Sequence, residues 1–421
     1  MTESRFFIHP KLIVVTLLGF SSGLPRLLVA GTLVAMLTDK GLDTVALGLF
    51  ANVTMPYAFH WAWAPLMDHL RIPLLSETLG RRVSWIVLSQ AMVMLALLWM
   101  GVSMDAAEPL MIAVISTFIA FFSASQDIVI DAYRTEYLGP ELYGKGAASG
   151  VFGYRLGMLV AGAGALALAD RIPWGTVYLI MCGLMLIGMV TVLIAGEPKN
   201  TPEPVKAKTL SEWFSEAIVA PFRQFLTAHP QAVLILIFIV FYKMPDGFIN
   251  LMTTRFFMET GFSKTEIAAV GKIYGFFAVI IGGFVGGALL DKIGIKKALL
   301  SFFILHLATV TTYILLDHMG HQLPFLILSI TLDYFTGGMV TSALVALLMS
   351  LCNKQYTATQ YALLGALPAV ASTFLANGSG WVAVHLGWSG LFITGILLGL
   401  PALVLLKILW RNPSISLTNS R

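Results

Sequence analysis

The stretch GGALLDKIGIKK, residues 286–297, follows a long apolar run and has a counterpart early in the chain. The counterpart is APLMDHLRIPLLSETLGRR, residues 64–82, which also follows an apolar run and contains an insertion. Each copy places an aspartate, a glycine and a basic cluster in the same order. Basic residues alone would orient a loop at a membrane surface, but they do not explain an aspartate and a glycine at matched places. The pair therefore predicts a chain built from two related halves.

The composition places most of the chain in lipid. Of its 421 residues, 57% are hydrophobic and 11% are charged, and the mean hydropathy is +0.84. A soluble domain carries roughly 25% charged residues, so this composition excludes a water-soluble fold. The apolar residues fall into runs of about 20 or more, the length that crosses a hydrocarbon core of roughly 30 Å. We expect a lipid bilayer around the chain and no nucleic-acid partner, because the placement of the basic residues fits membrane loops.

These apolar runs, divided by charged or Gly/Pro-rich breaks, predict an all-α polytopic membrane protein with twelve transmembrane helices in two six-helix bundles. The expected spans are about 12–37, 43–66, 83–103, 109–134, 146–169, 173–195, 232–257, 265–290, 297–316, 323–350, 357–383 and 387–410. The expected domains are an N-terminal bundle over 1–196, a linker over 197–230 and a C-terminal bundle over 231–421.

The linker begins as a polar stretch and then changes character. Its second part, SEWFSEAIVAPFRQFL, spaces four apolar residues for one face of a helix lying at the membrane interface. These residues are Trp213, Phe214, Ile218 and Phe222. A plain flexible connector is an equally good interpretation of the same stretch.

The basic residues predict the orientation. Most of the 26 Lys and Arg residues fall in the termini, the linker and alternate loops when the N-terminus is placed in the cytoplasm. The positive-inside rule then puts both termini in the cytoplasm and requires an even number of spans. We expect the chain to lie in a bacterial inner membrane. Cys182 and Cys352 show neither CxxC spacing nor a nearby histidine cluster, so we expect no disulfide framework, metal or other cofactor.

Several ionisable residues fall inside the expected spans. Such a side chain costs at least about 2.5–3.5 kcal/mol at bilayer depth, so each is a functional candidate. Arg26, Lys243 and Asp333 lie near the middle of their helices, and Asp246 is one turn from Lys243. His306 is a lone polar residue in its span, and we expect a structural role for it.

Aspartates supply the candidates for proton coupling: Asp127, Asp131, Asp246 and Asp333. Asp127, Asp131 and Arg134 are spaced i, i+4 and i+7, which places them on one helix face. Burial raises the proton affinity of a carboxyl group and a nearby cation lowers it, so a moving arginine could load or unload a proton. A static ion pair is the alternative, and it is at least as good an interpretation for Asp131.

The remaining interior polar residues predict an anionic small-molecule substrate. Basic side chains in one cavity suit carboxylates or phosphates, and neighbouring tyrosine and amide groups can add hydrogen bonds. The substrate-binding candidates are Arg26, Gln126, Tyr154, Arg155, Tyr242, Lys243 and Lys272. We expect a monomer, and we expect no enzyme, because the sequence has no metal-ligand set, nucleophile motif or nucleotide-binding loop.

The two opening stretches resemble the G-x-x-x-D-[RK]-x-G-[RK]-[RK] loop of major facilitator transporters, the second copy closely. This resemblance implies the major facilitator fold, in which helices 1, 4, 7 and 10 line a central cavity. It also implies a cytoplasmic latch of acidic and basic residues that must break when the inner side opens. The gate candidates are Asp68, Arg81, Arg82, Asp291, Lys292 and Lys296.

Other stretches resemble the AmpG muropeptide permeases: GFSSGLPRLL (19–28), SASQDIVIDAYRTE (123–136), GYRLGMLVAG (153–162), YKMPDGF (242–248) and GGMVTSALVALLMSLCNKQYTATQYALLGAL (337–367). The resemblance implies proton-driven import of anhydromuropeptides through a cavity that contains Arg26, Gln126, Asp127, Tyr154, Arg155, Lys243 and Asp246. Two features depart from that family: the chain stops soon after the twelfth expected span, and Pro245 is expected to kink its helix.

Relatives in the same branch that carry siderophores or acetyl-CoA remain alternatives, because their cargoes are also anionic. A membrane sensor or scaffold without transport is a further alternative, but it would need neither midplane charges nor paired loops.

Overall fold

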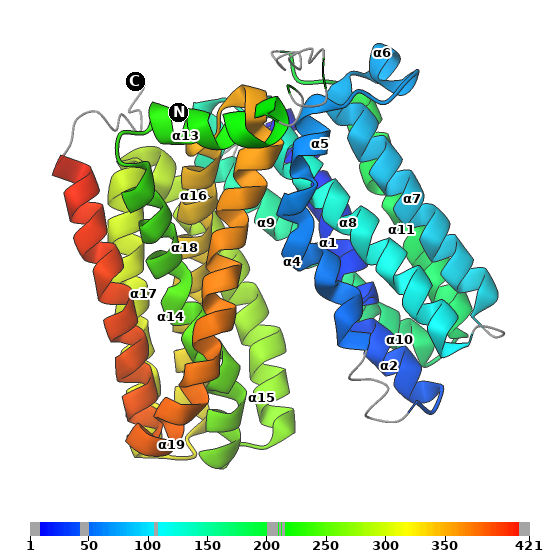
Figure 1. The fold of residues 1–421 in the computed structure, drawn as a ribbon. Coiled ribbons are helices and arrows are strands. Elements are labelled where there is room, and N and C mark those ends of the chain that lie inside the picture. Colours follow the sequence, from blue (N-terminus) through cyan, green and yellow to red (C-terminus); the bar gives the residue numbers. More distant parts are fainter. Residues whose placement is uncertain are drawn as a thin grey trace. The chain divides into compact units, whose positions relative to one another are not determined.

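The computed structural model describes residues 9–42, 50–104, 108–199, 209, 212 and 215–411, and these residues form helices and connecting loops without strands (Figure 1). The chain divides into two compact units. Unit 1 contains Met1–Gly139, Ser149–Pro221 and Cys352–Ala362, and unit 2 contains Pro140–Ala148, Phe222–Leu351 and Leu363–Arg421. Each unit therefore includes a short segment from the sequence half that otherwise forms the other unit.

Unit 1 contains the long helices of the first half of the chain and several short elements. The long ones are α1 (Pro10–Leu28), α2 (Gly31–Asp39), α7 (Arg81–Ser103), α8 (Pro109–Tyr137), most of α9 (Tyr143–Leu159) and α11 (Trp174–Ala195). The short ones are η1 (Phe50–Thr54), α4 (Met55–Phe59), η2 (His60–Ala62), α5 (Ala64–His69), α6 (Leu75–Leu79), η4 (Val160–Gly164), α10 (Ala165–Ala169), η5 (Ser215–Val219) and η7 (Lys354–Tyr356).

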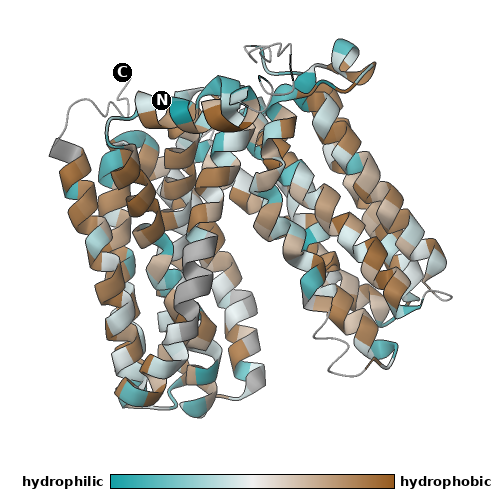
Figure 2. Ribbon diagram, viewed as in Figure 1, coloured by the Kyte–Doolittle hydropathy of each residue, from teal (hydrophilic) through white to brown (hydrophobic). Residues whose placement is uncertain are grey.

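Unit 2 contains most of α13 and α19 and the long helices between them. Its elements are η3 (Pro140–Leu142), α13 (Ala220–Ala228), α14 (Ala232–Glu259), α15 (Lys264–Val270), η6 (Gly271–Gly275), α16 (Phe276–Ile293), α17 (Ile295–Met319), α18 (Leu323–Leu351) and α19 (Thr357–Arg411). Figure 2 shows hydrophobic residues along most of these helices and hydrophilic residues gathered in α13 and in the connections at helix ends. This distribution is typical of helices that cross a bilayer.

Ten helices in the described part of the chain are long and apolar enough to span a membrane. The region of the expected span at 43–66 is described from residue 50 and consists of short elements that end with α5. The expected spans at 357–383 and 387–410 both lie in α19, which has a non-helical residue at Gly387 with φ of 72°. Twelve spans therefore stay a prediction, as do the bundle boundaries at 196/197 and 230/231 and the placement of the termini.

One expected helix is interrupted near a polar residue, and another continues through a proline. The first expected span, 12–37, breaks between α1 and α2, where Ala30 has a non-helical backbone and Pro25 lies one turn earlier. Arg26 is consequently in the last turn of α1. By contrast, α14 stays helical through Pro245 from Ala232 to Glu259. In the linker, Trp213 and Phe214 lie outside the described residues, so the interfacial helix stays a prediction.

Glycines bring α1 and α9 into close backbone contact within unit 1. A Cβ atom on Gly153 would collide with the carbonyl oxygen of Thr16, and one on Gly23 would collide with the backbone of Tyr154. Small residues at such crossings let helices approach closely in a membrane. The crossing positions Arg26 and Tyr154, from two different helices, in the same part of unit 1.

Candidate functional site

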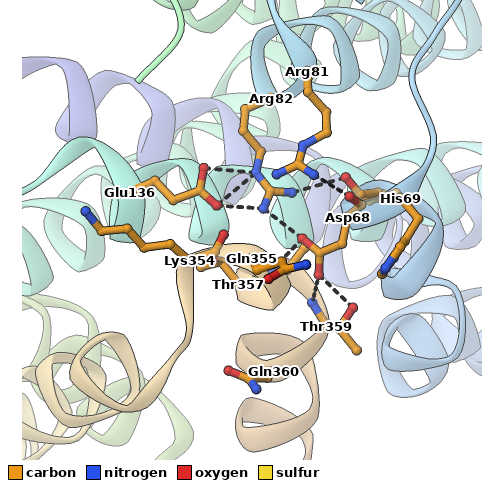
Figure 3. A network of polar contacts seen from close by, with 12 residues as sticks. Asp68, His69, Arg81, Arg82, Glu136, Lys354, Gln355, Thr357, Thr359 and Gln360 are labelled. Atoms are coloured by element: carbon orange, nitrogen blue, oxygen red, sulfur yellow. Dashed lines mark hydrogen bonds and ion pairs between the residues drawn. The ribbon is translucent and has the colours of Figure 1, made fainter. Parts of the chain in front are cut away.

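Arg82 is the centre of a buried ion-pair network in unit 1 (Figure 3). Its Nη2 lies 2.7 Å from Asp68 Oδ1 and 2.6 Å from Glu136 Oε1, and its Nε lies 3.1 Å from both oxygens of Glu136. The Arg82 side chain has no exposed surface. Arginine suits this position because its planar guanidinium group binds a carboxylate through two parallel hydrogen bonds. The network joins α5, α7 and α8.

The Asp68 carboxylate also accepts hydrogen bonds from the start of α19. Asp68 Oδ2 accepts hydrogen bonds from the Thr359 backbone N–H at 2.8 Å and from its hydroxyl at 2.7 Å, and Oδ1 accepts one from the Ala358 N–H at 3.2 Å. The first N–H groups of a helix have no partner within the helix and carry partial positive charge, so a carboxylate stabilises them. Asp68 therefore binds Arg82 and the N-terminus of α19 at the same time.

Neighbouring groups complete the network. Glu197 accepts hydrogen bonds from the backbone N–H groups of Arg82 and Val83, each at 2.9 Å, and so caps α7. Gly80 precedes this cap with φ of 86°, a conformation that favours glycine. Arg81 donates to the backbone oxygen of Asp68. Tyr356, two residues before Ala358, donates to Glu216 at 2.7 Å, and burial together with this carboxylate raises the pKa of Tyr356 above its usual range.

The second copy of the loop has a comparable arrangement within unit 2. Asp291 lies 3.7 Å from Lys145 Nζ and accepts a backbone hydrogen bond from Gly144, in the first turn of α9. Asp291, like Asp68, is thus bound to the start of a helix. Lys292 is exposed at the end of α16, and Lys296 lies in the first turn of α17. The two aspartates have matched partners, whereas the basic residues after them differ in burial between the copies.

Asp127 is the candidate coupling residue with the simplest environment. It is half-buried in α8, and its Oδ1 accepts a hydrogen bond of 2.5 Å from the hydroxyl of Ser22 in α1. Among the described residues, no Lys, Arg or His lies within ion-pair distance of this carboxyl group. Arg26 lies within electrostatic range of it but places its guanidinium over the ring of Tyr57, 3.9 Å from the ring centre. Asp127 is therefore a carboxyl group without a bound cation in the described part of the chain, and proton coupling by Asp127 stays a prediction.

Asp131, one turn further along α8, is bound to a cation. Its Oδ1 lies 2.7 Å from Arg134 Nη2, and the same nitrogen donates to the Tyr361 hydroxyl at 2.7 Å. Tyr361 is part of the α19 segment that belongs to unit 1. This geometry is the ion pair that the spacing allowed as an alternative, and proton coupling by Asp131 stays a prediction.

Three further candidates of unit 1 lie near Asp127. Gln126 is fully buried, and its side-chain amide donates to the backbone oxygen of Ser21 at 2.8 Å. Tyr154 and Arg155 lie half-buried on α9, and Tyr154 is within electrostatic range of Asp127. The structure thus brings these residues together near the crossing of α1 and α9, while substrate binding by them stays a prediction.

Unit 2 has its own charged cluster. Lys243 Nζ lies 2.7 Å from Asp246 Oδ2 and 3.2 Å from Thr341 Oγ1. Asp246 Oδ1 lies 2.7 Å from His306 Nε2, and Asp333 Oδ1 lies 3.8 Å from His306 Nδ1. Asp333 also accepts a hydrogen bond of 3.0 Å from the Tyr313 hydroxyl. The side chains of Lys243 and Asp246 retain 22% and 23% of their exposure, so the cluster is accessible from its Lys243 end.

Two further candidates of unit 2 are Tyr242, which is within electrostatic range of Asp246, and Lys272. Tyr242 is buried, stacks on Phe303 at 4.5 Å between ring centres, and donates to the backbone oxygen of Leu299. These contacts place Tyr242 in the packing between α14 and α17. Lys272 lies in the π-helical turn η6, and its side chain is outside the described part of the chain.

Sequence reasoning missed four residues that these sites contain. Glu136 and Thr359 lie within the quoted stretches 123–136 and 337–367, but nothing in their spacing relates them to Asp68, which is far away in the chain. Tyr57 falls in an apolar segment, where aromatic residues usually serve packing. His306 was visible as an ionisable residue inside a span, and that signal alone would have justified placing it among the candidates.

No group of three or more His, Cys, Asp or Glu residues with metal-binding geometry occurs in the part of the chain that the structure covers.

Comparisons with known proteins agree with these observations. The profile of the Major Facilitator Superfamily matches residues 12–367 and 244–420. The anhydromuropeptide permease of Escherichia coli strain K12 is 40% identical over 407 residues, which cover 96% of this chain and 80% of that protein. A protein of Rickettsia conorii described as putative transporter AmpG 4 is 31% identical and covers 97% of this chain and 99% of its own length. Among solved structures, the human organic anion transporter MFSD10 superposes with a TM-score of 0.71 at 15% identity, covering 94% of this chain and 99% of that one.

Proposed function

Because the chain belongs to the major facilitator superfamily, and within it to the AmpG-like permeases, we propose that it imports anhydromuropeptides with protons by alternating access. It is a multi-pass transporter of the inner membrane. The proposed substrate rests on the 40% identity to the Escherichia coli anhydromuropeptide permease, which extends over 96% of the chain. Twelve spans, cytoplasmic termini and a monomeric state belong to the same proposal.

The charges of each unit suit this cargo. An anhydromuropeptide joins sugar rings to a short peptide that bears carboxylates, so it needs cations for the peptide and hydrogen-bonding or ring contacts for the sugars. Arg26 stacked on Tyr57 offers a fixed guanidinium group in unit 1, and the partly exposed Lys243 offers an ammonium group in unit 2. Such cations give the electrostatic complementarity that an anionic cargo needs.

Asp127 supports the coupling step. A half-buried carboxyl group without an ion pair gains stability from a proton, and the approach of a cation such as Arg26 makes the proton leave. In the proposed cycle Asp127 takes a proton from the periplasmic side together with the substrate and releases it on the cytoplasmic side.

The Asp68 network supports the gating step. Asp68 and Arg82 are fully buried, and removing one partner of such a pair leaves an uncompensated charge that costs about 3–5 kcal/mol. In the proposed cycle, the cytoplasmic side opens only when α19 withdraws its N–H groups from Asp68. We propose that Asp291, bound to the start of α9, is the equivalent gate residue of the second half.

Uptake into proteoliposomes tests the proposal. Purified protein is reconstituted, and accumulation of a labelled anhydromuropeptide and of a ferric siderophore is compared with and without an imposed gradient that is acidic outside. We expect gradient-driven accumulation of the anhydromuropeptide alone. Accumulation of the siderophore alone would show that anhydromuropeptides are not the substrate. Equal uptake of anhydromuropeptide with and without the gradient would reject proton coupling.

A further inference from the structure

His306 lies buried in α17 between two carboxylates that come from different helices. It is 4% exposed. Its Nε2 is 2.7 Å from Asp246 Oδ1 of α14, and its Nδ1 is 2.8 Å from Thr336 Oγ1 and 3.8 Å from Asp333 Oδ1, both of α18. All three helices belong to unit 2. Both ring nitrogens therefore have a polar partner.

The hydrogen-bond geometry around the ring favours an imidazole that is protonated at both nitrogens. The Thr336 hydroxyl lies 2.9 Å from the backbone oxygen of Leu332 and 3.1 Å from that of Asp333, so its proton has an acceptor on its own helix. Thr309 likewise donates to the backbone oxygen of His306 at 2.7 Å. With these protons placed, Thr336 presents a lone pair to Nδ1 while Asp246 presents a carboxylate to Nε2. A neutral imidazole has one N–H and can serve only one of them.

The charges around the ring also call for one additional proton in the cluster. The titratable groups that face His306 in the described part of the chain are Lys243 and Asp246 from α14, Asp333 from α18 and, through Asp333, Tyr313 from α17 itself. One lysine cannot balance two aspartates. A single extra proton makes the cluster neutral, and a buried cluster with unbalanced charge is costly.

We propose that the Asp246–His306 pair is a second proton-binding site and that its loading is linked to anion binding at Lys243. The proton forms an N–H bond at Nε2 and is shared by a hydrogen bond with Asp246 Oδ1, while Nδ1–H is held by Thr336. No other bond forms or breaks. The link to substrate rests on the proposed function, whereas the protonated state of the pair does not.

The sign of the linkage follows from Lys243. In the described state its ammonium group lies 2.7 Å from Asp246 and lowers the affinity of the pair for a proton. An anion that attracts Lys243 withdraws this cation and adds negative charge, so the pair binds its proton more tightly. Because linkage is reciprocal, a proton on the pair strengthens anion binding by the same factor. Proton and anion therefore load together and leave together, as import with protons requires.

Nuclear magnetic resonance of the imidazole nitrogens tests the site without substrate. Full-length protein carrying 15N-labelled histidine is placed in nanodiscs, and the His306 signals are identified by comparison with His306→Gln. We expect both nitrogens of His306 to be protonated at pH 7, and Asp246→Asn to lower the pH at which His306 titrates. A neutral His306 tautomer at pH 7, with Thr336 donating to Nδ1, would overturn the proposal. His318→Gln, at an exposed position of the same helix, is the matched control and should leave the His306 signals unchanged.

Calorimetric binding of an anhydromuropeptide tests the linkage over a pH range that extends above the pH at which substrate-free His306 loses its proton. A single coupled proton changes affinity by at most about tenfold per pH unit, with tighter binding at the lower pH. We expect a clear slope of this sign in the wild type and in His318→Gln, and a smaller slope in His306→Gln. Equal slopes in all three proteins would overturn the linkage. Absence of binding in every protein would reject the substrate of the proposed function, while the resonance measurement would still decide the proton site.

Discussion

Arg82 lies fully buried between two carboxylates, so its replacement leaves Asp68 and Glu136 without a cation. We predict that Arg82→Met lowers the free energy of unfolding by about 3–5 kcal/mol. The measurement is thermal or denaturant unfolding followed by tryptophan fluorescence in detergent. Arg223→Ala is the control, because Arg223 is exposed on α13 and its removal should have little effect. Equal stability of the two variants would show that the Asp68 network contributes nothing to the folded state.

The proposed role of Asp127 requires its side chain to change its protonation state. We predict that Asp127→Asn abolishes accumulation against a gradient, since an amide keeps the contact with Ser22 but cannot release a proton. Exchange of labelled for unlabelled substrate across the membrane should continue. Asp39→Asn removes a carboxylate that is exposed and binds the indole of Trp174 at 2.9 Å, and it should leave accumulation unchanged. Concentrative uptake by Asp127→Asn would remove Asp127 from the coupling step.

At the level of helices, the crossing of α1 and α9 depends on the absence of side chains. We predict that Gly153→Ala lowers the free energy of unfolding by about 1–3 kcal/mol, because the new methyl group collides with the carbonyl oxygen of Thr16. Gly183→Ala is the matched control in α11, where a Cβ meets no atom within 4 Å. The test is the unfolding temperature of both variants. An unchanged unfolding temperature for Gly153→Ala would mean that α1 and α9 can move apart without loss of stability.

The sequence could predict the long helices but not where they break. Long apolar runs were sufficient to predict helices such as α7, α8, α11 and α14, because lipid leaves the backbone few other ways to satisfy its hydrogen bonds. The break at Ala30 was not predicted, since no glycine or proline occupies that residue and Pro25 lies earlier. The continuity of α14 through Pro245 also could not be deduced, because neighbouring groups in a membrane protein can accommodate the missing N–H.

The sequence likewise predicted some of the site residues and not others. Buried charges such as Asp127, Lys243 and Asp246 were recognisable because an ionisable group inside an apolar run is costly. Their partners were not, because Thr359 lies far from Asp68 in the chain, and His306 lies far from Asp246. Distances along one helix predicted the pair of Asp131 and Arg134 as an alternative, whereas contacts between helices required the structure.

At the scale of the whole molecule, the two loop copies place an aspartate against the start of a helix in each unit. Asp68 holds the N-terminus of α19 within unit 1, and Asp291 holds the start of α9 within unit 2. The segment of α19 bound by Asp68 is encoded in the second half of the chain, and the segment of α9 bound by Asp291 is encoded in the first. A chain with two related halves can in this way use one interaction twice, which suits a carrier that opens to each side in turn.

Movement of protons with the substrate is the most direct test of this account. Proteoliposomes containing a pH-sensitive dye are prepared without any gradient, and an anhydromuropeptide is added outside. The account predicts acidification of the lumen that depends on the added anhydromuropeptide and is lost in Asp127→Asn. Entry of labelled anhydromuropeptide at an unchanged internal pH would contradict it.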